Sequence, residues 1–216
     1  PGLDGFMMEL LREMYEAENT ILDVDSLFDH PQLKESIRDL SIESPYRKLI
    51  TKGVLSQYFR DGYLSLTFTV EGAYHYLLSR FIREEITYKS GEELVRILQK
   101  KLGLKGMAEA VGFCLLDEVL AGSFSKLSEF IQQGEKYLQV VSVPLATAIQ
   151  LFNTGKNADN EALADALVCD SIEHSVEAVL LADYILERNL FTESRYAFFK
   201  TLLSKINTDS LPKELL

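Results

Sequence analysis

The feature that most constrains the fold is a change of hydrophobic period near residue 60 in an otherwise helical pattern. Two short runs, 54–59 and 63–70, flank the pair Asp61-Gly62. In the second run every other residue is apolar, which is typical of a strand with one buried face. An Asp-Gly pair between such runs is a strong signal for a two-residue hairpin turn. The sequence therefore predicts one β-hairpin, and the core-facing residues of its second strand are Leu64, Leu66, Phe68 and Val70.

Amphipathic spacing predicts three helices before the hairpin. The first spans Gly5 to Glu18, with apolar residues recurring three or four positions apart. The second follows Pro31, and the third begins at Ser44-Pro45, where serine can cap a helix and proline fits its first turn. We assign no element to the polar stretch 19–30. The residues predicted to face the core are Phe6, Met7, Leu10, Leu11, Met14, Leu33, Ile37, Leu40, Tyr46, Leu49 and Ile50.

A closing helix is predicted over residues 72–87. Three helices, a hairpin and a closing helix within about 85 residues have the order of a winged helix, which is a helix-turn-helix variant. Three segments resemble, more specifically, the winged helix that follows the ATPase core of STAND-class (AAA+/NACHT-like) signalling NTPases. These segments are Tyr46 to Leu55, Asp61 to Phe68, and Tyr76 to Leu78. The resemblance covers roughly residues 5–88, about two fifths of the chain.

The resemblance carries several expectations. In that family the winged helix is a regulatory hinge that packs against the nucleotide-binding core, and helical or repeat regions follow it. Some members place a phosphate-sensing histidine on this module, but the third helix here has none, so no sensor residue is carried over. The chain begins at Pro1 with no methionine and no signal peptide pattern, and we interpret it as part of a larger protein whose ATPase core would lie upstream.

From Ser90 onward the pattern is helical, with glycine or asparagine at the expected ends. Short loops favour antiparallel neighbours, so we predict an irregular array of helical hairpins. The fold class is mainly α, with a winged-helix domain over 1–88 and a helical-hairpin, repeat-like domain over 89–216. The predicted helices are 92–102, 107–120, 124–133, 135–152, 161–169, 172–187 and 193–206.

Composition favours a protein of the cytoplasm. Cys114 and Cys169 each lie in an apolar run without a second cysteine nearby, which indicates neither disulfides nor a zinc site. No apolar stretch approaches the roughly 20 residues that a membrane span requires. A formal net charge of −11 repels phosphate backbones, so we do not expect nucleic acid as a partner.

Motifs for catalysis or cofactor binding are missing from the sequence. Gly155-Lys156 lacks the upstream glycine and the following serine or threonine of a phosphate-binding loop. Asp170, His174 and Glu177 fall on one helical face and could hold a metal, but a solvated acidic face explains them more simply. We therefore predict no catalytic, cofactor-binding or metal-ligating residue, and no enzyme activity.

One basic cluster accompanies the third helix and the wing, and it consists of Arg47, Lys48, Lys52 and Arg60. Such residues contact DNA in many winged helices. Residues 1–88, however, hold nine basic and fifteen acidic residues, so the surrounding charge opposes DNA. Lysines near the end of a helix are also explained by its dipole. We interpret the cluster as an exposed helix face or a protein contact.

The leading hypothesis is a non-catalytic regulatory and protein-interaction fragment of a larger signalling ATPase. Its partners would be another protein or the NTPase core of the same chain. The alternative is a DNA-binding transcription regulator with a helical ligand-binding or dimerisation domain. A third hypothesis is a small-molecule or metal site near His174. The signal sensed and the oligomeric state do not follow from the sequence.

Overall fold

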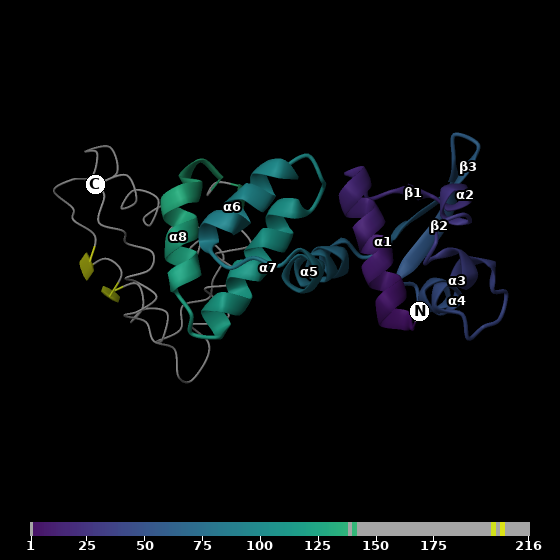
Figure 1. The fold of residues 1–216 in the computed structure, drawn as a ribbon, viewed down its shortest axis with the longest axis horizontal. Coiled ribbons are helices and arrows are strands. Elements are labelled where there is room, and N and C mark those ends of the chain that lie inside the picture. Colours follow the sequence, from purple (N-terminus) through teal and green to yellow (C-terminus); the bar gives the residue numbers. More distant parts are fainter. Residues whose placement is uncertain (1, 138–139, 142–199, 202–203, 206–216) are drawn as a thin grey trace. The chain divides into compact units, whose positions relative to one another are not determined.

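The computed structural model describes residues 2–137, 140–141, 200–201 and 204–205, and Figure 1 shows their helices and strands. The chain divides into two compact units. The first is made of residues 1–86 and 101–107, and the second of residues 87–100 and 108–216. A short segment near residue 104 therefore belongs to the first unit although the residues on both sides of it belong to the second.

Short helices and a small sheet make up the described part of the first unit. Its elements are α1 (Leu3–Ala17), β1 (Leu22–Asp23), α2 (Val24–Leu27), α3 (Lys34–Arg38), α4 (Pro45–Thr51), β2 (Leu55–Arg60), β3 (Tyr63–Phe68), α5 (Glu71–Phe81) and a π-helical turn (Ile82–Ile86). The sequence predicted one continuous closing helix over 72–87, and the structure instead ends α5 at Phe81 and continues it as the π-helical turn.

Helix α1 supplies much of the core of this unit. Phe6, Leu10, Leu11 and Met14 are each 0% exposed, which confirms the predicted apolar stripe. Met8, rather than the predicted Met7, completes the buried face. The helix ends where Glu18 adopts a left-handed conformation (φ 51°) and its backbone N–H donates to the Met14 carbonyl.

The predicted hairpin is confirmed. Strands β2 and β3 pair antiparallel from Leu55↔Phe68 to Arg60↔Tyr63. Asp61 (φ 54°) and Gly62 (φ 88°) connect them, and two successive positive φ angles are what a type I′ turn requires. A third strand was not predicted: β1 pairs with β3, which gives the sheet order β1-β3-β2.

Three details of the predicted helices and strands are wrong. Leu40 is 80% exposed rather than inward, because α3 ends at Arg38 and the next residue is extended (ψ 113°). Val70 is 58% exposed because β3 ends two residues before it. Ser44 precedes α4 but does not cap it; its hydroxyl donates instead to the Ser36 carbonyl at 2.5 Å.

The described part of the second unit is helical. Its elements are α6 (Gly91–Lys100), α7 (Met107–Leu120, whose first residue is assigned to the first unit), α8 (Ser125–Gly134) and a 3₁₀ turn (Glu135–Tyr137). The bounds of α7 are those the sequence predicted. A mainly α fold with one small hairpin is thus confirmed, whereas the helices predicted for 161–169 and 172–187, and most of 135–152 and 193–206, lie outside the described residues.

Helices α6 and α8 meet at Gly91. A Cβ atom on Gly91 would collide with the backbone of Lys126 and Phe130 and would stand 2.8 Å from the Glu129 Cβ. Gly91 also donates its backbone N–H to the Glu129 carboxylate at 2.8 Å. Only glycine lets the two helices approach this closely.

None of the helices described by the structure combines the length and the apolar character needed to cross a membrane.

Candidate functional sites in the first unit

Two of the predicted contact residues, Arg47 and Lys48, lie on α4, and another side of this helix packs in the core. Tyr46 and Leu49 are each 2% exposed and hold α4 in the core. Arg47 lies beside Tyr46, with its guanidinium carbon 6.0 Å from the centre of the Tyr46 ring. Lys48 forms an ion pair with Glu43, with Nζ and Oε2 2.5 Å apart. Lys52 follows α4, is exposed, and makes no ion pair with any described residue.

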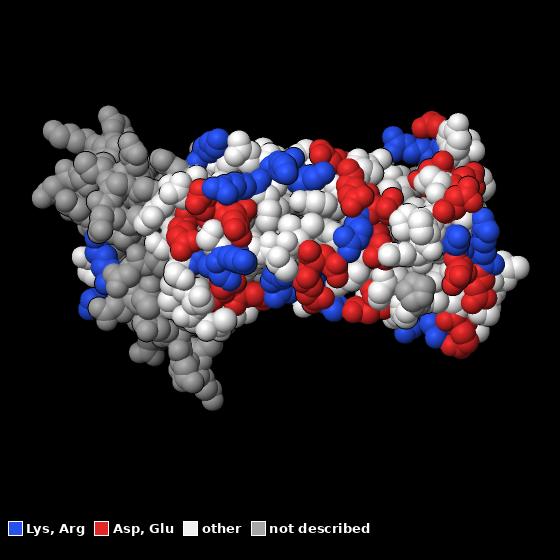
Figure 2. Space-filling view, in the orientation of Figure 1, with Lys and Arg blue, Asp and Glu red and all other residues white. Residues whose placement is uncertain are grey.

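The fourth predicted contact residue, Arg60, lies at the end of β2. Its Nε is 3.5 Å from the Asp61 carboxylate in the turn, and both side chains are exposed. The structure thus pairs both Lys48 and Arg60 with neighbouring acids. Figure 2 shows the same mixing more widely, because red and blue side chains alternate over the visible face of the first unit and form no broad blue patch.

The hairpin itself has a feature that the sequence analysis did not single out. Leu55, Gln57 and Phe59 alternate along β2, so they share the face of the hairpin that meets the core. Leu55 is 1% exposed at the base of this row, whereas Phe59 is 79% exposed at its end. Tyr63, which pairs with Arg60, is 59% exposed. The core-facing row therefore ends in an exposed aromatic side chain at Phe59, and Tyr63 adds a second exposed aromatic residue on the opposite face of the hairpin tip.

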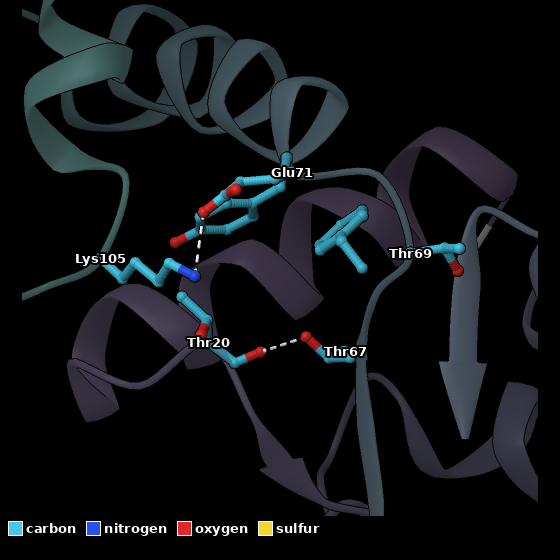
Figure 3. A pocket seen from close by; sticks show the side chains of 7 residues that line it. Thr20, Thr67, Thr69, Glu71 and Lys105 are labelled. Atoms are coloured by element: carbon cyan, nitrogen blue, oxygen red, sulfur yellow. Dashed lines mark hydrogen bonds and ion pairs between the residues drawn. The ribbon is translucent and has the colours of Figure 1, made fainter. Parts of the chain in front are cut away.

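A second candidate site is a pocket of about 150 Å³ in the same unit. Figure 3 shows its labelled side chains, which come from the loop after α1, from β3 and the residue after it, from the start of α5, and from the 101–107 segment. The Thr67 hydroxyl donates to the Thr20 carbonyl at 2.9 Å and so joins β3 to the loop after α1. The lining residues are Thr20, Thr67, Phe68, Thr69, Glu71, Tyr74 and Lys105.

Two opposite charges lie at this pocket. Lys105 Nζ is 2.9 Å from Glu71 Oε1, and the two side chains are 72% and 59% exposed. The two point toward each other from different elements (Figure 3). Hydrogen bonding from the Lys105 ammonium lowers the pKa of the Glu71 carboxyl. The Glu71 carboxyl therefore stays ionised at neutral pH.

Tyr74 contributes a buried polar group to the pocket lining. The residue is 4% exposed, and its hydroxyl is shielded from solvent and has no hydrogen-bond partner among the described residues. Burial raises the pKa of this hydroxyl, so it remains a protonated donor. A buried hydroxyl without a partner costs roughly 1–3 kcal/mol, which makes it a group that a ligand could satisfy.

Gly106 sets the path of the backbone next to Lys105. It has φ +84°, and a Cβ there would collide with the His75 ring and come within 2.9 Å of Tyr74 Cε1. The loop backbone therefore passes directly over these two rings. His75 is 9% exposed, and its Nε2 has no partner among the described residues.

Sequence reasoning missed this pocket. Glu71 and Lys105 are ordinary charged residues 34 positions apart, and no motif links them. The only available signal was the pair of glycines around Leu104 and Lys105, which indicates a special backbone conformation but not its neighbours. The suggested metal group near His174 lies outside the described residues. Within the described residues, no three His, Cys, Asp or Glu side chains gather where they could hold a metal ion.

No family model matches this chain, and comparison with curated proteins and with solved structures found no match either.

Proposed function

We propose that this chain is a non-catalytic regulatory and protein-interaction part of a larger signalling ATPase. In this proposal the first unit is a winged helix that binds a nucleotide-binding core outside residues 1–216, and the helical region binds partner proteins. The order of helices α1 to α4 followed by the hairpin supports the winged-helix assignment. So does the pairing of β1 with the second hairpin strand, which ties the start of the unit to the wing.

The observation that carries the proposal is the exposed Phe59 at the end of the hairpin. Phe59 lies on the face of β2 that is buried at Leu55, yet it is 79% exposed. Leu40 and Ile42, in the loop before α4, are 80% and 70% exposed. These exposed apolar side chains, on the hairpin and in the loop before α4, support contact with a protein partner that would cover them.

Electrostatics favour a protein partner over DNA for the same surface. DNA affinity depends on cations that are free to replace the counterions of phosphates. Lys48 and Arg60 are engaged by acids, and the Arg47 Nε is shielded from solvent. Among the four predicted contact residues, Lys52 is the one that is exposed and unpaired within the described residues. One such lysine supports little phosphate binding.

The direct test is binding of the purified chain to the separately purified ATPase core of its parent protein. We expect association at micromolar concentrations, and we expect Phe59→Ser to weaken it at least about tenfold, because a central apolar contact contributes more than about 1.4 kcal/mol. Leu120→Ser is the matched control, since Leu120 is 52% exposed in the second unit. Equal effects of the two substitutions, or no association at all, would reject the proposal.

A DNA-binding experiment distinguishes the alternative. Fluorescence anisotropy measures binding of the chain to a labelled DNA duplex at low salt. We expect no binding that becomes weaker when Lys52 is changed to alanine. Binding that falls steeply as salt rises, and that weakens in this variant, would favour the transcription regulator instead.

A further inference from the structure

The size of the pocket beside Glu71 and Lys105 limits what it can hold. Its volume of about 150 Å³ is close to that of a cavity that admits one benzene-sized molecule. Pockets for drug-sized ligands and cofactors are usually 300–1,000 Å³. The pocket therefore suits a ligand of about six non-hydrogen atoms and is too small for a nucleotide.

The charges of the pocket limit the ligand further. Glu71 and Lys105 are one carboxylate and one ammonium with their charged atoms 2.9 Å apart. A simple anion would be attracted to Lys105 but repelled by Glu71, and a simple cation would face the reverse. A ligand that carries both charges side by side can place each against its opposite, as two ion pairs do when they stack head to tail.

The uncharged groups complete the pattern. Tyr74 offers a buried O–H with no acceptor among the described residues. The Thr67 hydroxyl already donates to the Thr20 carbonyl, so it can only accept from a ligand. The pocket thus has donors for a carboxylate, at Lys105 and Tyr74, and acceptors for an ammonium, at Glu71 and Thr67.

We propose that this pocket binds a small zwitterion, an α-amino acid with a short side chain. Its carboxylate pairs with Lys105 Nζ and accepts from the Tyr74 hydroxyl, while its ammonium pairs with Glu71. Phe68 and the threonine methyl groups contact the short side chain. Because Lys105 is 72% exposed, its side chain has room to rearrange when the ligand enters. The inference depends only on this pocket and is independent of the protein-binding surface.

Amide chemical shifts of the whole 216-residue chain test the idea. Glycine, L-alanine and L-serine, titrated to tens of millimolar, should shift the signals of Thr69, Lys105 and Gly106. Acetate, methylammonium and glycerol serve as probes with only the carboxylate, only the ammonium or only hydroxyl groups. We expect these three to leave the same signals unchanged at equal ionic strength.

Variants separate the proposal from non-specific effects. Tyr74→Phe removes only the hydroxyl, and we expect it to weaken binding of the amino acid at least about tenfold, as for loss of a hydrogen bond to a charged group. Glu71→Gln and Lys105→Gln should weaken it too. Lys89→Gln changes an exposed lysine away from the pocket lining and should have no effect.

Four outcomes would overturn the proposal. The first is that no amino acid shifts the amide signals of Thr69, Lys105 and Gly106. The second is that acetate shifts them equally, and the third is that only glycerol shifts them. The fourth is that Tyr74→Phe binds the amino acid as tightly as the unaltered chain. Circular dichroism of each variant establishes that it is folded. Should Tyr74→Phe fail to fold, Glu71→Gln and Lys105→Gln, which alter exposed side chains, provide the decisive comparison.

Discussion

The two units hold their helices together in different ways. In the first unit, α1 is tied to the region of α5 by exposed charged pairs far apart in sequence: Arg80 to Asp4 at 2.7 Å and Arg12 to Glu85 at 2.6 Å. In the described part of the second unit, α6 and α8 meet where the backbone passes beside Gly91. Exposed charge pairs can rearrange in water, whereas a backbone contact cannot, so the two units should respond oppositely to changes of charge and of volume.

The largest effect should come from Gly91→Ala. The added methyl group would overlap the backbone of α8, so the helices must separate, and we expect a loss of about 3 kcal/mol in the free energy of unfolding. Urea unfolding followed by circular dichroism measures this loss. Gly72→Ala is the control, because no atom lies within 4 Å of its added Cβ, and a helical alanine should stabilise by about 0.5–1 kcal/mol. A similar loss of unfolding free energy in both variants would show that the contact at Gly91 is not the cause.

Gly106→Ala tests a place where the first unit also depends on a glycine because side chains pack against it. Its positive φ and the rings of Tyr74 and His75 both oppose a side chain, but the His75 ring can move. We therefore expect a smaller loss, about 2 kcal/mol. The amide signals of the first unit should change most in this variant. Changes of amide signals confined to the second unit would contradict the assignment of residues 101–107 to the first unit.

Ser44→Ala removes a single buried hydrogen bond. Ser44 is 1% exposed and Ser36 is 5% exposed, so the Ser36 carbonyl would be left without its donor away from water. We expect a cost of about 1–2 kcal/mol in chemical unfolding. Ser26 makes a similar bond to the Asp23 carbonyl at 2.7 Å but is exposed. Its change to alanine should cost less than about 0.5 kcal/mol, and equal costs would show that burial is not the cause.

The charged pairs of the first unit should give the smallest effect, visible as a dependence on pH. Hydrogen bonding from Arg80 lowers the pKa of the Asp4 carboxyl in the folded chain. A lowered folded-state pKa stabilises the fold above the ordinary value near 4, and this contribution is lost as pH falls through the lowered value.

Arg80→Met removes this contribution. The melting temperature of the unaltered chain should therefore fall more steeply with acid below about pH 4 than that of the variant. Asp39→Asn offers a comparison that leaves Arg80 intact. Hydrogen bonds from Ser41 lower the pKa of the Asp39 carboxyl. Parallel pH profiles for Arg80→Met and the unaltered chain would show that the pair contributes nothing.

Local signals in the sequence predicted the long elements well. The bounds of α7 agree with the apolar pattern from Met107 to Leu120, and the hairpin follows from Asp61-Gly62. In each case neighbouring residues alone decide the conformation. The apolar stripe of α1 was also confirmed, apart from the exchange of Met7 for Met8.

Elements that depend on distant partners were missed. β1 is only two residues long and exists because Leu22 pairs with Leu66, 44 positions later. The same limitation hid the pocket, because Lys105 reaches Glu71 through the fold and not through sequence spacing.

The inclusion of residues 101–107 in the first unit has a consequence for synthesis on the ribosome. Chains emerge from the amino end, so this unit lacks its last segment until α6 has already been made. Leu104, which is 1% exposed, is among the residues that arrive late. A nascent chain stalled near residue 88 would hold the hairpin but not the loop over Tyr74 and His75. Translation pauses before residue 107 would therefore prolong a state in which those two rings are uncovered.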